Sequence, residues 1–152
     1  MGARDTLDIV MTLAAQEAMA AGYAEITTAH LVIALSRAAE TDTPLAMSTD
    51  NAAIRREFEV LGIAPRRFRR RLRALLGHGE AQHQGEPMHR SPTCKAVFAR
   101  AEQIAHAEHV PCHVSHLVRA AFAVWATDSG TDGTREAPGE VVPSDDDIPA
   151  AL

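Results

Sequence analysis

Histidines and cysteines, which bind zinc and take part in acid–base catalysis, gather in the second half of the chain. The densest group is His106, His109, Cys112, His113 and His116, with Cys94 upstream. Pro111 interrupts the helix between them, and the sequence has neither a paired Cys-x-x-Cys nor a His-Glu-x-x-His unit. We therefore predict no metal and no cofactor, and keep a His/Cys metal-binding protein as an alternative.

Two histidines occupy the same place in a repeated motif. Thr28-Ala29-His30-Leu31-Val32 recurs as Val114-Ser115-His116-Leu117-Val118, so the histidines are 86 residues apart (116 − 30). An alanine-rich run with helical spacing precedes each copy, which predicts a repeated pair of helices with a short connection. A histidine at a helix start usually makes a structural hydrogen bond, and neither has a nucleophile beside it. We predict no catalytic residues and no enzymatic activity.

Positive charge is concentrated in one short run, which holds six arginines between positions 66 and 73. Phe68, Leu72 and Leu75 divide this run at helical spacing, as expected for a solvated helix face above a core. The run has no aromatic platform and no second basic patch, so we do not expect nucleic-acid binding.

Negative charge is concentrated at the other end. From Asp128 onward there are seven acidic residues and only Arg135, a net charge of −6 (1 − 7). Gly, Pro, Asp, Thr and Ser dominate this part without apolar periodicity. Residues 127–152 are therefore predicted to be an acidic flexible tail or linker.

Length and composition favour one all-α domain. The 152 residues are 46% apolar, enough for a core, while only 4% are aromatic, which favours helices packed through small side chains. No window approaches the roughly 18 apolar residues of a membrane span. The two cysteines do not make a disulfide framework, so they are expected to be reduced and the chain cytoplasmic.

Apolar spacing predicts four helices in a first repeat, residues 6–76. The first runs from about Thr6 to Ala21 before Gly22, and Thr27 or Thr28 caps the second. Residues 40–51 are predicted to form a loop. The third helix ends at Gly62 and Pro65 opens the fourth. Their predicted inward residues are Ile54, Phe58, Leu61, Phe68, Leu72, Leu75 and Leu76.

A second repeat, residues 91–126, follows a glycine-containing linker, residues 77–90. Ser91 offers a cap and Pro92 the first position of a fifth helix. A sixth helix has an apolar face that ends at Trp125. This repeat lacks counterparts of the third and fourth helices, which we expect to leave apolar surface exposed. Both repeats belong to one helical domain, residues 1–126.

Together these features resemble the amino-terminal repeat domain of the Clp (Hsp100) unfoldases. The resemblance spans about Thr6 to Trp125 and includes both His-Leu helix starts, Val60-Leu61-Gly62-Ile63 and Ser91-Pro92. It implies a pseudo-twofold pair of helical lobes that recruits protein clients or adaptor proteins to an AAA+ unfoldase or protease complex. A regulatory subunit that competes for Clp clients is an alternative. Without a Gly-x-x-x-x-Gly-Lys-Ser/Thr loop, the chain by itself is not the motor.

The same resemblance suggests where a ligand binds. In the Clp C branch an acidic residue often precedes the histidine and holds phosphoarginine, whereas here Ala29 and Ser115 stand in that place. We place the peptide or adaptor site at Thr28, Ser91 and Ser115, where helix starts can hold an acidic or phosphorylated group. The expected groove lies between the repeats, near the starts of the second and sixth helices.

Overall fold

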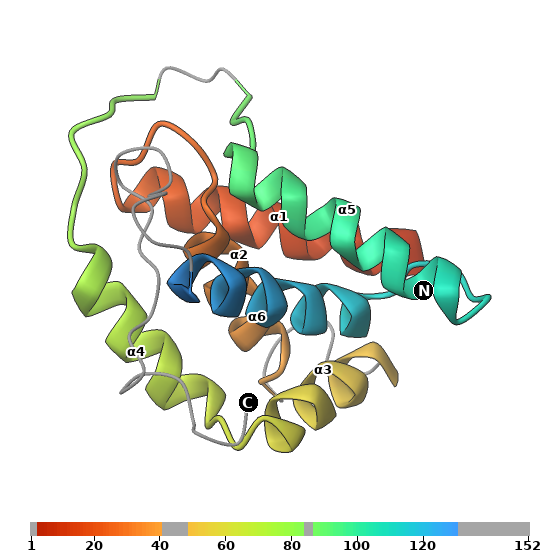
Figure 1. The fold of residues 1–152 in the computed structure, drawn as a ribbon. Coiled ribbons are helices and arrows are strands. Elements are labelled where there is room, and N and C mark those ends of the chain that lie inside the picture. Colours follow the sequence, from red (N-terminus) through yellow and green to blue (C-terminus); the bar gives the residue numbers. More distant parts are fainter. Residues whose placement is uncertain (1–2, 41–48, 84–86, 131–152) are drawn as a thin grey trace.

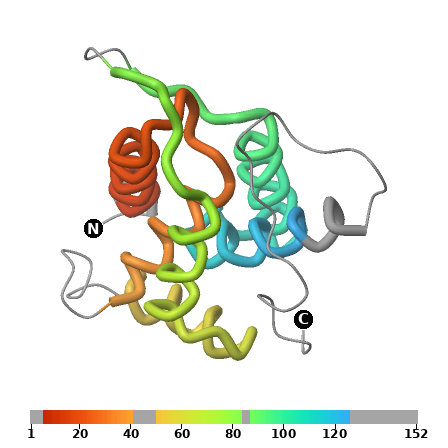
Figure 2. The backbone as a smooth tube through the Cα atoms, turned by 90° about the vertical axis from the view of Figure 1, so that its left-hand side faces the viewer, coloured from red at the N-terminus to blue at the C-terminus, as the bar shows by residue number. Residues whose placement is uncertain are grey.

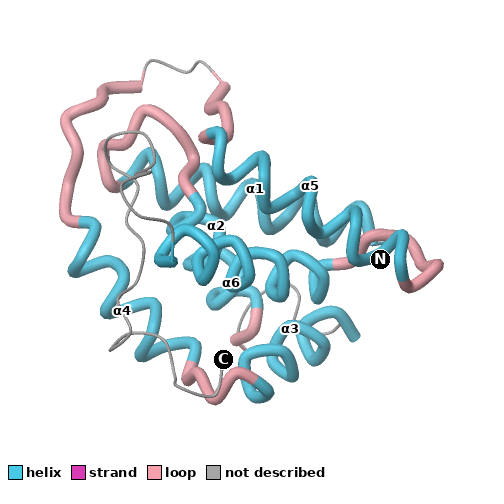
Figure 3. Tube along the Cα trace, in the orientation of Figure 1, coloured by secondary structure: helices cyan, strands magenta, loops and turns pink. Residues whose placement is uncertain are grey.

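A computed structural model describes residues 3–40, 49–83 and 87–130, with side chains for residues 6–40, 50–83 and 87–125. Within these ranges the chain forms only helices and one isolated β-bridge (Figures 1 and 3). The helices are α1 (Ala3–Ala20), α2 (Thr28–Ala38), α3 (Thr49–Val60), α4 (Pro65–Leu76), α5 (Pro92–Ala107) and α6 (Val114–Gly130). The prediction of an all-α fold is confirmed.

Local sequence accounts for most helix ends. The hydroxyl of Ser91 accepts a hydrogen bond from the backbone N–H of Cys94 at 3.1 Å, so it caps α5 as predicted. Thr27, rather than Thr28, caps α2. Gly22 and Gly62 follow α1 and α3 with φ of 73° and 71°, the left-handed conformation that glycine adopts without steric cost.

The two helical hairpins, α1–α2 and α5–α6, pack against each other through their second helices. α2 contacts both helices of the other hairpin, and α6 contacts both α1 and α2. Figure 2 shows α1 and α5 on opposite sides of α2 and α6. Residues of α2 are almost all buried because it is covered by α1, α4, α5 and α6. α2 is therefore the central helix of the core.

Helices α3 and α4 of the first repeat cover α6 of the second. Phe58 of α3 and Phe68 of α4 contact Phe122, at ring-centroid distances of 6.1 and 5.7 Å, and Phe68 also contacts Trp125 at 6.4 Å. Trp125 is fully buried. The prediction that the short second repeat exposes apolar surface is therefore wrong, because helices of the first repeat cover it.

Three local predictions are also corrected. α3 begins at Thr49, inside the segment predicted to be a loop, because Asp50 and Asn51 bond to other helices and not to solvent. Leu75 was expected to face inward but is 50% exposed. α6 continues to Gly130, beyond the predicted start of the tail. The rest of the predicted tail, residues 131–152, lies outside the described residues.

The segment between the repeats runs beside the α1–α2 connection. Ile26 forms a parallel bridge with Arg90, and the N–H of Gly79 donates to the carbonyl of Ala21 at 2.7 Å. Gly22 and Gly79 approach so closely that a Cβ at Gly22 would lie 2.5 Å from the Gly79 carbonyl oxygen. The two glycines directly follow Ala21 and His78, which line the pocket described below.

We expect Gly22→Ala to destabilise the domain by about 2 kcal/mol, because it combines backbone strain at positive φ with a clash. Gly62→Ala is the matched control for backbone strain, because Gly62 also follows a helix with a φ of 71° and takes part in the same pair of helix-end hydrogen bonds as Gly22. It should cost only about 1 kcal/mol. Urea unfolding monitored by circular dichroism measures both, and equal losses would contradict the proposed role of the Gly22–Gly79 contact.

Candidate functional site

The structure places two of the predicted site residues in the interior. Thr28 is fully buried and Ser91 is 1% exposed, and the Ser91 hydroxyl is engaged in capping α5. Ser115 is partly exposed at the start of α6. Thr28 and Ser91 lie close to each other, because the N–H of Ser91 donates to the carbonyl of Ile26 at 2.9 Å.

Ser115 lies at the opposite end of α1 from these two residues. His113, just before α6, pairs with Asp50, and Asp50 accepts a hydrogen bond from Thr6 in the first turns of α1. The start of α2 instead follows the other end of α1, where the Tyr23 ring contacts His30. From Thr6 to Ala20 a helix rises about 21 Å. One small ligand group therefore cannot contact both helix starts.

The two repeated histidines have the same structural role. The Nδ1 atom of His30 accepts a hydrogen bond from the backbone N–H of Thr27 at 3.1 Å. In the second repeat, Nδ1 of His116 accepts from the backbone N–H of His113 at 2.9 Å. Each histidine thus returns a bond to the residue before its helix, as Glu or Gln does in a capping box. Since Nδ1 is the acceptor, the neutral ring carries its proton on Nε2.

The Nε2 atoms of the two histidines differ in their partners. Nε2 of His116 bonds to Glu108 at 2.8 Å. Glu108 directly precedes His109, the residue with positive φ that follows α5, and the counterpart of His109 after α1 is Gly22, so Ala21 stands in the place of Glu108. No carboxylate replaces Glu108 in the first repeat, and Nε2 of His30 has no hydrogen-bond partner among the described residues. Such a buried donor without an acceptor is uncommon.

His30 lines a pocket of about 360 Å³ between α1, α2 and α4. Its Nδ1 side is turned toward Thr27, so Nε2 is on the opposite edge of the ring. The pocket wall combines small and apolar side chains with a few polar ones. The lining residues are Glu17, Ala20, Ala21, His30, Ile33, Arg73, Leu76, Gly77 and His78. A cavity with mostly apolar walls and few polar groups is typical of ligand sites.

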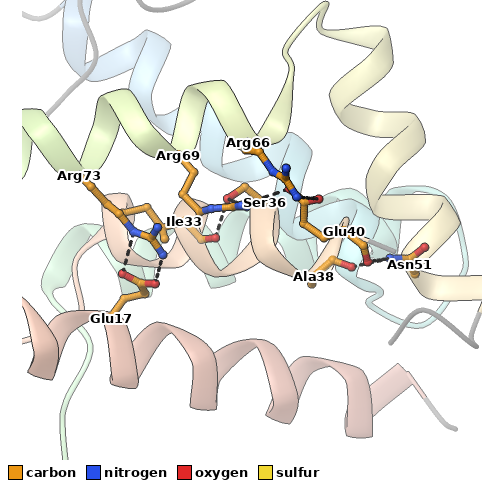
Figure 4. A network of polar contacts seen from close by, with 9 residues as sticks. All are labelled: Glu17, Ile33, Ser36, Ala38, Glu40, Asn51, Arg66, Arg69 and Arg73. Carbon is orange, nitrogen blue, oxygen red and sulfur yellow. Dashed lines mark hydrogen bonds and ion pairs between the residues drawn. The ribbon is translucent and has the colours of Figure 1, made fainter. Parts of the chain in front are cut away.

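Positive charge exceeds negative charge at one side of this pocket. Glu17 forms an ion pair with Arg73 (Figure 4) and another with Arg37, the latter at 3.3 Å, so two guanidinium groups surround one carboxylate. Further along α4, Arg69 bonds Glu40 at 3.1 Å and the Ser36 hydroxyl at 3.3 Å. These arginines fix α4 beside α1 and α2, and so define the pocket's width.

Burial lowers the pKa of His30 from 6.5 to about 4, although the nearby Glu17 carboxylate partly opposes this effect. The imidazole is therefore neutral at pH 7. It offers a hydrogen-bond donor without a positive charge, and Arg73 supplies the charge at the pocket.

The His/Cys group of the second repeat is divided among separate contacts. His113 pairs with Asp50, His116 with Glu108, and Cys94 is buried. Burial raises the pKa of the Cys112 thiol, which disfavours the thiolate that metals bind. Within the described ranges, no three His, Cys, Asp or Glu side chains are arranged to hold a metal ion.

Sequence reasoning missed Glu17, Arg73 and Asp50. Glu17 and Arg73 are 56 residues apart and Asp50 and His113 are 63 apart. Their pairing depends on helix packing and leaves no local pattern. The only local signal was the difference between Ala21 and Glu108 at the same place in the two repeats.

Two helical hairpins pack against each other through their second helices, and a pocket lies at the start of one of these helices. The sequence has no phosphate-binding loop. Together these features define a duplicated helical binding domain. The profile of the Clp repeat (R) N-terminal domain family matches residues 4–123. The chain therefore belongs to this family, as the resemblance predicted. Members of the family are noncatalytic, protein-binding modules of Clp-type systems.

A search of curated proteins found no match to the sequence. In the described part of the chain, no helix is long and apolar enough to cross a membrane.

Proposed function

We propose that this chain recruits protein clients or adaptor proteins to a Clp-type AAA+ unfoldase or protease in the cytoplasm. In this proposal residues 1–126 form the binding domain and residues 127–152 a tail or linker. The observation that carries it is the family match over residues 4–123, in a chain without a nucleotide-binding loop.

We place client binding in the α1–α2–α4 pocket. It lies at the start of α2, where the repeated motif led us to expect a ligand, and it has apolar walls that an unfolded segment could bury. The exposed large apolar side chains among the described residues are Met19, Val60, Leu75 and Val110, which lie on different elements. They do not form an equivalent second site.

The test is a titration of the ¹⁵N-labelled full chain with an unfolded client, such as reduced and carboxymethylated α-lactalbumin. Amide shifts should cluster at Glu17–Ala21, His30–Ile33 and Arg73–His78. Ala20→Trp, which fills the pocket from an exposed position on α1, should weaken binding about ten-fold or more, or about 1.4 kcal/mol.

The matched control is Ala99→Trp, which places the same ring on the exposed side of α5. It should leave the affinity unchanged within about two-fold. Equal effects of the two substitutions, or shifts confined to the exposed Arg67 and Arg70 on α4, would refute this placement and favour an electrostatic surface.

A further inference from the structure

We infer that the α1–α2–α4 pocket is a carboxylate-binding site, in which the Nε2–H of His30 donates to the carboxylate and Arg73 supplies the counter-charge. This inference rests on the proposed function, because it names the chemical group of a client or adaptor that the pocket would select. The carboxylate can come from an Asp or Glu side chain or from the carboxyl terminus of a polypeptide.

The second repeat provides an internal precedent for this chemistry. There the same histidine, held by the same Nδ1 bond to the residue before its helix, directs Nε2 at the Glu108 carboxylate. Arg119 bonds the same carboxylate at 2.9 Å. A histidine N–H and an arginine thus hold one carboxylate in the second repeat. The first repeat has the histidine and an arginine beside a pocket, but Ala21, which lines that pocket, in place of the glutamate.

The Nε2–H donor of His30 is buried without an acceptor, which is energetically unfavourable. The residue is 1% exposed, and its Nε2 has no acceptor among the described residues. A buried donor left without an acceptor loses its bond to water and gains none in exchange. Nε2 itself is buried, so a ligand carboxylate in the pocket that His30 lines would restore that bond after a small shift of the surrounding side chains, and a charged acceptor makes a stronger bond than a neutral one.

Charge around the pocket also favours an anion. Glu17 is negative, but Arg37 and Arg73 both pair with it, which leaves a net positive charge on this group. The Arg73 side chain is 48% exposed, so part of its guanidinium can contact a ligand while it remains bound to Glu17.

The size and lining of the pocket set a limit on what carries the carboxylate. Ala20, Ala21, Ile33 and Leu76 form an apolar wall suited to methylene or methyl groups next to the charged group. A volume of about 360 Å³ admits one or two residues and excludes a folded element. The structure thus points to a short acidic segment or a chain terminus.

The experiment uses the ¹⁵N-labelled full chain and three acetylated peptides. They are acetyl-Ala-Glu-Ala-amide, its Gln counterpart, and acetyl-Ala-Ala with a free carboxyl terminus. Long-range ¹H–¹⁵N spectra of the imidazoles should show the Nε2–H tautomer of His30, and a carboxylate peptide should shift its Nε2 resonance. A response to the Glu peptide identifies a side-chain carboxylate, and a response to the free terminus identifies a terminal one.

Two variants and two matched controls assign the effect to the pocket. His30→Gln keeps an acceptor for the Thr27 N–H but removes the donor, and should abolish the response of the pocket amides. Arg73→Gln, at a half-exposed side chain that should tolerate the change, should weaken binding about five-fold or more. His116→Gln makes the same exchange in the second repeat, and Arg100→Gln removes an exposed arginine on α5. Neither control should alter the response.

Equal binding of the Glu and Gln peptides, or no response to any of the three peptides, would overturn the carboxylate assignment. Unchanged affinity in both His30→Gln and Arg73→Gln would do the same. These outcomes can be distinguished from failure of the proposed function. A client that binds in the pocket through apolar contacts alone would still bind more weakly to Ala20→Trp.

Discussion

Trp125→Ala is expected to destabilise the domain by about 3–5 kcal/mol, the largest effect of any single change considered. Trp125 is fully buried and contacts Phe122 at 5.7 Å and Phe68 at 6.4 Å. Its removal opens a cavity where α4 of the first repeat covers α6 of the second. For a chain of this size the loss corresponds to a fall in melting temperature of about 10 °C or more. Urea and thermal unfolding, followed by far-UV circular dichroism, measure both quantities.

Leu75→Ala is the control, because Leu75 is a similarly apolar residue on α4 but is 50% exposed. It should cost less than about 1 kcal/mol. If Trp125→Ala lowered the unfolding free energy no more than this control, helices of the first repeat would not cover α6 in solution. The apolar face of α6 would then have to be covered in another way.

Acidification from pH 7 to pH 4 is expected to remove about 3 kcal/mol of stability through His30 alone. Its pKa is about 4 in the folded chain and near 6.5 when unfolded. Between these values the unfolded chain binds a proton that the folded chain does not, so stability falls as the pH drops through this window. Above about pH 6.5 both states hold a neutral ring, and His30 contributes no slope.

His30→Gln isolates this term from the carboxylates that titrate over the same range. Gln at the third helical position keeps the capping bond to Thr27 and does not ionise. Between pH 7 and pH 4, the difference in unfolding free energy between the two proteins, measured in urea, should therefore shift by about 3 kcal/mol in favour of the variant. Parallel curves would show that His30 is protonated as readily in the folded chain as in the unfolded chain. The buried position of its side chain would then be incorrect.

Features that depend on a few neighbouring residues were predictable. Ser91 and Pro92 begin α5, Pro65 begins α4 and Gly22 follows α1, because caps and turns are set by bonds within about four residues. The start of α3 was missed because Asp50 and Asn51, polar residues typical of loops, bond to distant parts of the chain.

The candidate site was predictable only in part. The repeat located His30 at a helix start and led us to expect a ligand nearby, but Thr28 and Ser91, expected to contact it, are buried. The pocket arises where α1, α2 and α4 meet, and its charged wall depends on Glu17 and Arg73, which are distant in sequence.

The sequence by itself determined the helices, the repeat and the family, because periodicity and capping are local and the order of the motifs can be read directly from the residues. Only the tertiary structure decided how the short second repeat is completed and which histidine is left without an acceptor. The first depends on packing between the repeats, where side chains of α3 and α4 meet α6, and the second on how α1, α2 and α4 surround His30.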